Sequence, residues 1–194
     1  MTPVETVSSS SKRDLLMETA WKLFYRDGYR AVGIDTLLAE AGVAKMTLYN
    51  HFPSKEALIV AVLEKRSGGL LTAIDQAIAE AGRSPTKRIL SVFDGLKNWF
   101  ATDDFKGCAF IRALSEYPEP DHPIHRAAWS HKRAVNSRLR AIADEAGVKN
   151  SAALADSISL LIDGSIVAAH ATGSVAPADT ARAAALSMLK AALP

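Results

Sequence analysis

Apolar side chains recur along this chain every three to four residues, the period of an amphipathic helix, and no stretch alternates as a strand does. The first stretch places Leu16, Ala20, Leu23 and Phe24 on one face and stops at Gly28. Similar stretches follow, separated by glycine or proline, and they predict about nine helices. The pattern therefore favours an all-α fold.

Two short helices are expected after the first. Apolar Ile34, Leu37, Leu38 and Ala41 form the second, which breaks at Gly42. A third runs over about residues 44–52 and is ended by Pro53. Ser54 can cap a fourth helix of residues 54 to about 67, which the Gly68-Gly69 pair is expected to break.

Further helices are expected in the remaining two thirds of the chain. Ser84 and Pro85 start one in the favoured order of cap and first helical residue. The predicted ranges are 85–101, 105–117, 123–147, 151–172 and 177–193, with a proline-rich connector at 118–123.

Composition and charge limit the class of protein but do not indicate its function. Of the 194 residues 48% are hydrophobic, which is enough for a packed core. Residues 1–66 carry nine Lys/Arg and eight Asp/Glu, so bulk charge gives no evidence for nucleic acid. A single cysteine, a polar Ser-rich start and no run of about 18 apolar residues predict a cytoplasmic protein without membrane association.

The most informative segment is residues 37–52, LLAEAGVAKMTLYNHF. A helix-turn-helix needs a left-handed turn residue where Gly42 stands, and Val43 and Leu48 can pack the second helix on the first. An exposed second helix can then enter a major groove and contact phosphates. Its outward side chains are Lys45, Met46, Thr47, Tyr49, Asn50 and His51. The alternative is an ordinary helical hairpin with a glycine turn.

Residues 28–58, GYRAVGIDTLLAEAGVAKMTLYNHFPSKEAL, resemble the DNA-binding segment of the tetracycline-repressor-like (TetR) family. The AGV turn, the TLYNHF helix and PSKEAL carry the resemblance, which in detail covers about residues 12–66. It implies a disordered arm (1–11), a three-helix DNA-binding domain (12–53) and a larger helical domain for effector binding and dimerisation (54–194). The helix starting at residue 54 would connect the two domains.

The resemblance also implies roles for individual residues. Lys45, Met46 and Tyr49 occupy positions that usually meet base edges or the DNA backbone. Thr47, His51 and Lys55 occupy typical phosphate-contacting positions. The family usually has a Thr or Ser pair at the start of the second helix, but Val32 and Gly33 stand there, so a backbone N–H would have to replace that contact.

An apolar effector pocket is expected in the C-terminal domain, since aromatic residues gather on three of its predicted helices. KGCAFIRALSEY (106–117) and LLIDGSIVAAH (160–170) also resemble strings common in the family's effector domain. Asp163 and His170, seven residues apart on one helix, could contact a ligand or form a structural pair. The expected lining is Phe93, Trp99, Phe110, Ile111, Leu114 and Trp129, and core packing is the alternative for each.

Small residues dominate the last two predicted helices, for example Gly164, Ala168 and Ala185. Small side chains let helices approach closely, as in a four-helix interface between two subunits. We therefore expect a homodimer formed through residues 151–193, although close packing within one subunit would use the same residues.

These features predict a repressor that leaves a palindromic double-stranded operator when a small-molecule effector binds. The alternative is a helical small-molecule-binding protein or enzyme with no DNA-binding role. No nucleophile elbow, phosphate loop or metal-ligand cluster is evident, so we expect no enzyme and no cofactor. A sensing role for Cys108, or for His122 and His125 as an HxxH metal motif, stays open.

Overall fold

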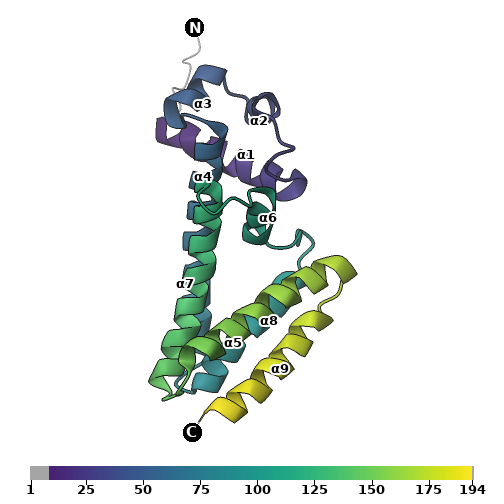
Figure 1. The fold of residues 1–194 in the computed structure, drawn as a ribbon. Coiled ribbons are helices and arrows are strands. Elements are labelled where there is room, and N and C mark those ends of the chain that lie inside the picture. Colours follow the sequence, from purple (N-terminus) through teal and green to yellow (C-terminus); the bar gives the residue numbers. More distant parts are fainter. Residues whose placement is uncertain (1–8, 194) are drawn as a thin grey trace. The chain divides into compact units, whose positions relative to one another are not determined.

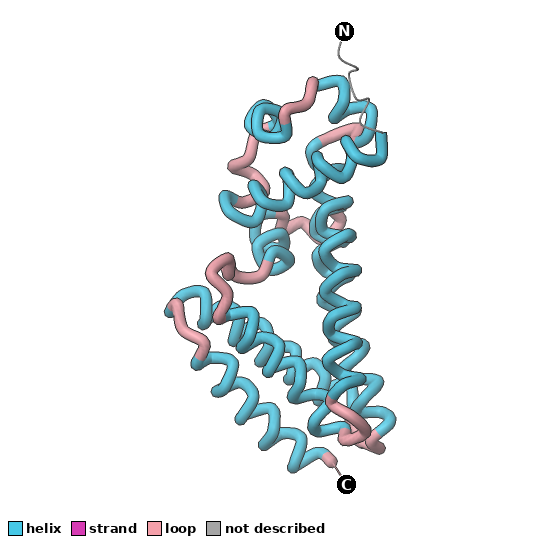
Figure 2. The backbone as a smooth tube through the Cα atoms, turned by 180° about the vertical axis from the view of Figure 1, so that it is seen from behind, coloured by secondary structure: helices cyan, strands magenta, loops and turns pink. Residues whose placement is uncertain are grey.

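The computed structural model describes residues 9–193, and within them the chain forms helices and no strand (Figures 1 and 2). This confirms the all-α fold and the predicted number of helices. The described helices are α1 (Ser9–Asp27), α2 (Ile34–Ala41), α3 (Lys45–His51), α4 (Lys55–Glu80), α5 (Pro85–Phe100), α6 (Ala109–Glu116), α7 (Pro123–Glu145), α8 (Ser151–Thr172) and α9 (Ala176–Ala192).

The chain divides into two compact units. One holds the chain up to Arg66 together with Arg112–Ala128, and the other holds Ser67–Ile111 and the chain from Trp129 onward. These units follow from packing within the chain, so the functional boundary expected between residues 53 and 54 stays a prediction. Residues 1–8 of the expected arm lie outside the described residues, and α1 already begins at Ser9.

In the first unit, α1 packs against α2 and α3. Side chains from each of these helices, from the loop after α1 and from the start of α4 are fully buried, namely Leu16, Phe24, Tyr29, Leu37, Leu48, Leu58 and Ile59. Burying such side chains is the main favourable contribution to folding, about 1.5–3 kcal/mol for each. The core therefore fixes α2 and α3 on α1.

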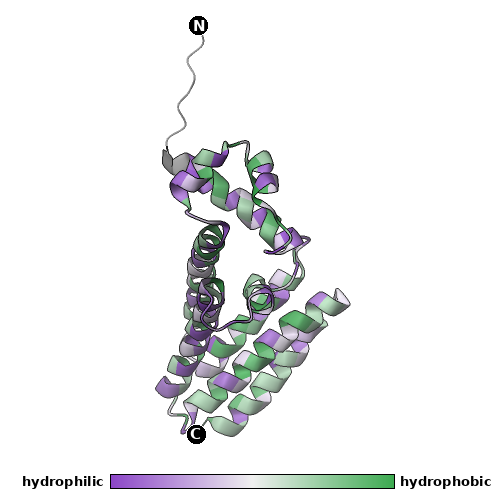
Figure 3. Cartoon of the chain, turned by 45° about the horizontal axis from the view of Figure 1, so that its top comes forward, coloured by the Kyte–Doolittle hydropathy of each residue, from purple (hydrophilic) through white to green (hydrophobic). Residues whose placement is uncertain are grey.

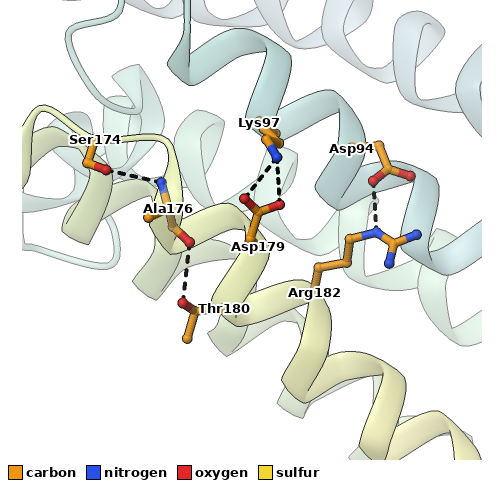
Figure 4. A network of polar contacts seen from close by, with 7 residues as sticks. All are labelled: Asp94, Lys97, Ser174, Ala176, Asp179, Thr180 and Arg182. Atoms are coloured by element: carbon orange, nitrogen blue, oxygen red, sulfur yellow. Dashed lines mark hydrogen bonds and ion pairs between the residues drawn. The ribbon is translucent and has the colours of Figure 1, made fainter.

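In the second unit, α5 packs against α8 and α9, and α9 lies beside α8 after the turn at Gly173 (Figure 1). Hydrophobic residues follow α8 and α9 along most of their length (Figure 3). Two surface ion pairs join α5 to α9, Lys97–Asp179 and Arg182–Asp94, each at 2.8 Å (Figure 4). The core residues include Ile89, Phe93, Ile158, Ile162, Ala185 and Leu189.

One described helix, α8, is long and apolar enough by length and composition alone to cross a membrane. Core helices pass the same test. Here α8 buries one side in the core of the second unit, through residues such as Leu154, Ile158 and Ile166. The observation is therefore weak evidence for a membrane span.

The predicted break at Gly68-Gly69 is wrong, because α4 continues without interruption to Glu80. A glycine inside a helix costs about 1 kcal/mol relative to alanine, and buried side chains on both sides of the pair outweigh that cost. Val62 and Leu63 are buried before it, and Ile78 is buried after it.

The helix predicted over residues 105–117 starts later, at Ala109. Gly107 has φ of +81°, and a Cβ atom there would lie 3.3 Å from the ring of His170. The backbone ahead of α6 is therefore not helical. The ring of Phe105 instead packs against the rings of Trp99 and Phe100, with its centroid 4.9 Å from each of theirs. The predicted cap of α5 is confirmed, since Ser84 Oγ accepts a hydrogen bond from Lys87 N at 3.4 Å.

Candidate nucleic-acid interface

A tight turn joins α2 to α3 and sets the angle between them. Gly42 ends α2 with φ of 63° and ψ of 35°, the left-handed conformation expected for a helix-turn-helix. Its N–H points to Ala39 O at 3.4 Å, and Val43 N donates to Leu38 O at 3.3 Å. The prediction of a helix-turn-helix at this glycine is confirmed.

Helix α3 has one buried face and one exposed face. Leu48 is completely buried and Val43 is half-buried, as predicted. Met46 is 68% exposed and Tyr49 is 40% exposed, although large apolar side chains are usually buried. Lys45 and Asn50 are also exposed, while Thr47 and His51 are half-buried at the edge of the same face. The structure thus brings all six predicted residues to the accessible part of one short helix.

Lys55, the first residue of α4, is held more tightly than the sequence suggested. Its ammonium Nζ donates to the backbone oxygen of Arg30 at 3.4 Å, and burial lowers the pKa of this side chain. A phosphate contact by Lys55 stays a prediction, and it requires the ammonium to share or leave that carbonyl. The predicted cap beside it is confirmed, since Ser54 Oγ accepts from Ala57 N at 3.1 Å.

The start of α2 lacks the hydroxyl cap that the family usually has. Gly33 is the N-cap residue and makes no side-chain hydrogen bond to the helix. Val32 is buried and has no hydroxyl. Neither position therefore offers a hydroxyl to cap α2, and a phosphate contact by a backbone N–H at this helix end remains a prediction.

Arg13 is a further cation at this surface that the sequence analysis missed. Its guanidinium lies 5.2 Å from the centre of the Phe52 ring, directly after the last residue of α3. Lys12 and Arg13 are both exposed on α1. A basic pair at the start of the first helix was the available signal, but nothing in the sequence placed it beside α3.

The predicted effector residues are divided between the two compact units. Phe93, Trp99, Phe110 and Ile111 belong to the second unit, and its core includes Phe93. Leu114 belongs to the first unit. Trp129, which also belongs to the second unit, is 53% exposed on α7. The effector assignment of these six residues stays a prediction.

Phe110 has a neighbour that the sequence analysis did not select. Its ring stacks on the ring of His131 with centroids 3.7 Å apart and planes 11° apart. His131 is buried on α7, and its Nδ1 atom lies 2.9 Å from the hydroxyl of Ser67. Burial, with the charges of Lys132 and Arg138, lowers the pKa of His131 to about 4. This histidine is therefore neutral at physiological pH.

Asp163 and His170 each have a partner other than one another. Asp163 pairs with the largely buried ammonium of Lys132 at 2.5 Å. The exposed His170 presents its ring at 6.2 Å and nearly perpendicular to that of Phe105. Seven residues along a helix span about 10 Å, which is too far for a direct hydrogen bond. Asp163 thus has a structural partner in Lys132, and the prediction that Asp163 or His170 contacts a ligand remains a prediction.

The HxxH motif fits a structural role better than a metal site. His125 Nδ1 lies 2.8 Å from the carbonyl oxygen of Tyr117, and His122 Nδ1 accepts from Ile124 N at 3.2 Å. Within the part of the chain that the structure describes, no three His, Cys, Asp or Glu side chains could hold a metal. Cys108 is half-buried against the core of the second unit.

Comparison with known proteins agrees with the geometry of α2 and α3. The family model for bacterial regulatory proteins of the tetR family matches residues 16–62. The curated regulator YjdC of Escherichia coli, an HTH-type transcriptional regulator, is 24% identical over 170 residues, which are 88% of this chain and 89% of YjdC.

Solved structures extend the likeness over nearly the whole chain. SCO4454, a TetR-family transcriptional regulator from Streptomyces coelicolor, is 29% identical, with 94% of this chain and 96% of that chain covered and a TM-score of 0.85. A TetR transcriptional regulator from Streptomyces avermitilis is 31% identical, with 94% and 98% covered and a TM-score of 0.82. The chain therefore belongs to the TetR family of bacterial regulatory proteins, and it is a DNA-binding transcriptional regulator and not an enzyme.

Proposed function

We propose that this regulator is a homodimeric repressor that reads a palindromic operator with α3 and releases it when a small apolar molecule binds. The observation that carries the proposal is the exposure of Met46 and Tyr49, beside Lys45, on a helix that follows a left-handed turn and packs on the core through Leu48. Such a helix can insert into a major groove and offer both apolar and charged groups to base edges.

Dimerisation is supported by an apolar stripe on α8. Leu160 is 75% exposed and Val167 is 55% exposed, and Gly164 and Ala171 continue the stripe at helical spacing. Large apolar side chains in a row on the surface favour a partner that covers them, and small residues between them allow close approach. A second copy of the chain supplies the same stripe in a twofold arrangement. A palindromic operator follows, because the symmetry of a dimer is matched by inverted half-sites.

The effector is proposed to be small and apolar. The buried rings of Phe93 and Phe110 and the half-buried ring of Trp99 make an apolar ligand the best match to the second unit. His131, buried and uncharged, adds one polar contact that needs no counter-ion. The ligand would have to favour the state that does not bind DNA by roughly 1–3 kcal/mol. The place of action is the cytoplasm, where a bacterial operator lies.

A selection experiment tests the operator-binding part. The full chain is incubated with a random pool of DNA duplexes, bound duplexes are recovered and sequenced, and the upstream region of its own gene is tested in a gel shift. We expect an inverted repeat whose half-sites lie about 10 base pairs apart, or a multiple of that spacing. Enrichment of no sequence would leave a ligand-binding protein without a DNA-binding role, and a direct repeat would contradict the symmetric dimer.

A further inference from the structure

Helix α6 holds the C-terminal end of α1 through a guanidinium. Arg112 donates from Nη1 to the backbone oxygen of Tyr25 at 2.8 Å and to that of Phe24 at 3.3 Å. Carbonyl groups in the last turn of a helix lack partners within it, and a cation there also meets the negative end of the helix dipole. Arg112 therefore occupies the position of a C-terminal cap, although it lies 87 residues from Tyr25 in sequence.

A carboxylate one helical turn further along α6 holds the residues that follow α1. Glu116 accepts from Tyr29 N at 3.1 Å through Oε1 and from Arg30 N at 2.7 Å through Oε2. Both oxygens of one carboxylate thus bind two consecutive backbone N–H groups, and such charge-assisted hydrogen bonds are stronger than neutral ones. We refer to Arg112 and Glu116 together as the α6 clamp.

Two more contacts converge on the same turn. The Arg30 guanidinium lies 4.9 Å from the centre of the Tyr117 ring, immediately after Glu116. Lys55, at the start of α4, donates to the carbonyl oxygen of Arg30. Arg30 is therefore fixed through its backbone N–H, its backbone oxygen and its side chain, although it is an exposed loop residue.

The turn that the clamp holds leads directly into α2, which begins at Ile34 and carries α3 on the other side of Gly42. Geometry at this turn is thus passed on to the helix that meets DNA. Misplacing a positioned group by about 1 Å can lower binding or activity strongly, even when the change is made elsewhere.

We propose that Arg112 and Glu116 are positioning residues for operator binding: they fix the turn between α1 and α2, and thereby the presentation of α3. The inference rests on the proposed operator binding. Both residues lie on one helix of eight residues, so a rotation or shift of α6 changes all four hydrogen bonds together. The recognition surface then depends on a helix that does not itself belong to the helix-turn-helix.

The test uses the full chain and an operator selected from the random duplex pool. Glu116→Ala should lower operator affinity about tenfold, and Glu116→Gln, which keeps an acceptor, should lower it less. Amide hydrogen exchange should speed up at Tyr29 and Arg30 in Glu116→Ala. The salt dependence of affinity should keep its slope, because no phosphate contact is removed.

Glu119→Ala and Arg126→Ala are matched controls, since both residues are exposed and no side-chain hydrogen bond or ion pair of either occurs among the described residues. Both should bind like the parent. If Glu116→Ala is unstable by thermal melting, Glu116→Gln and Arg112→Lys carry the same comparison.

Parental or higher operator affinity in a clamp variant with accelerated exchange at Tyr29 and Arg30 would overturn the proposal. So would a rise in affinity for Glu116→Gln, because removal of a repulsive charge near DNA would then explain the effect. A parent chain that enriches no duplex defeats operator binding and the clamp proposal together, whereas an enriched operator with unaffected variants defeats the clamp proposal alone.

Discussion

His131 on α7 and Ser67 on α4 share a hydrogen bond of 2.9 Å within the second unit, with the buried histidine ring stacked on Phe110. Burial holds the pKa of His131 near 4, whereas an unfolded chain protonates the same ring near 6.5. The unfolded state therefore binds more protons between these values, and the folded state loses stability as the pH falls through that window.

We accordingly predict a pH dependence that belongs to this one residue. Between pH 7.5 and pH 5 the parent should lose about 2 kcal/mol of unfolding free energy through His131 alone. His131→Gln keeps a hydrogen-bonding group but cannot titrate, so it should lack that loss. Urea unfolding at both pH values measures the difference. The pKa values of carboxylates such as Glu18 and Asp75 are lowered by their ion pairs in both proteins. Their contributions to the pH dependence therefore cancel when parent and variant are compared. Equal losses in parent and variant would show that His131 is not buried as a neutral ring.

Side chains on the exposed face of α3 should carry operator recognition. Tyr49→Ala should weaken binding to every sequence, and Lys45→Ala should also relax base preference, each by about 1–3 kcal/mol. Lys22→Ala is a suitable control, because Lys22 is an exposed lysine on α1 and belongs neither to the turn nor to α3. Gel shifts with the operator and with a scrambled duplex separate the two effects. Our assignment of α3 is wrong if both variants bind as Lys22→Ala does.

Lys55 offers a separate measurement. If its ammonium meets a phosphate in the complex, Lys55→Ala should reduce the slope of log affinity against log salt by about one. If the ammonium only donates a hydrogen bond to the carbonyl oxygen of Arg30, the operator affinity of Lys55→Ala can fall while its salt-dependence slope stays equal to that of the parent. Titrations at four or five salt concentrations distinguish these outcomes, and an unchanged slope removes Lys55 from the list of phosphate contacts.

Charge placed on the exposed stripe of α8 should separate the subunits. Leu160→Glu and Val167→Glu put carboxylates where the proposed interface buries apolar side chains, a cost that few interfaces tolerate. Sedimentation at micromolar concentration should show monomers, and operator affinity should fall with them. Leu70→Glu, at another exposed leucine on α4, should remain dimeric. A parent that already sediments as a monomer would contradict the proposed assembly.

An effector found by thermal shift against a metabolite panel should act through the rings of the second unit, since a ligand of the folded state raises its stability. Trp99→Ala and Phe110→Ala should lower the affinity of that ligand. Trp129→Ala should lose the response while still holding operator DNA. Trp21→Phe, a change in the first unit, should leave both properties intact. Unchanged ligand affinity in Trp99, Phe110 and Trp129 variants alike would place the pocket elsewhere.

Local sequence patterns were sufficient to predict the helices and the helix-turn-helix. The turn at Gly42, the buried Leu48 and the exposed Tyr49 all follow from spacing within a segment of about sixteen residues. The caps at Ser54 and Ser84 were predictable for the same reason, because a capping hydroxyl accepts a hydrogen bond from an N–H only three residues further along the chain.

Relationships between distant residues were not predictable in this way. Glu116 meets Tyr29 and Arg30 across more than 80 residues, and nothing near Glu116 in sequence indicates that partner. The pairing of Asp163 with Lys132, and of His131 with Ser67, depends equally on which helices pack together. The wrong prediction of a helix break at Gly68-Gly69 has a different cause. Glycine does disfavour a helix locally, but the burial of apolar side chains before and after the pair outweighs that preference.

The continuity of α4 has a mechanical consequence. This helix rises about 39 Å over its 26 residues, and its two adjacent glycines begin two residues after Arg66, where one compact unit ends. A Cβ atom would meet nothing within 4 Å at either glycine, so packing does not require them. We therefore expect α4 to bend most easily at these two glycines. Amide protons there should exchange faster than in the helical turns on either side. Alanine at both positions should stiffen it and stabilise the fold by about 1–2 kcal/mol.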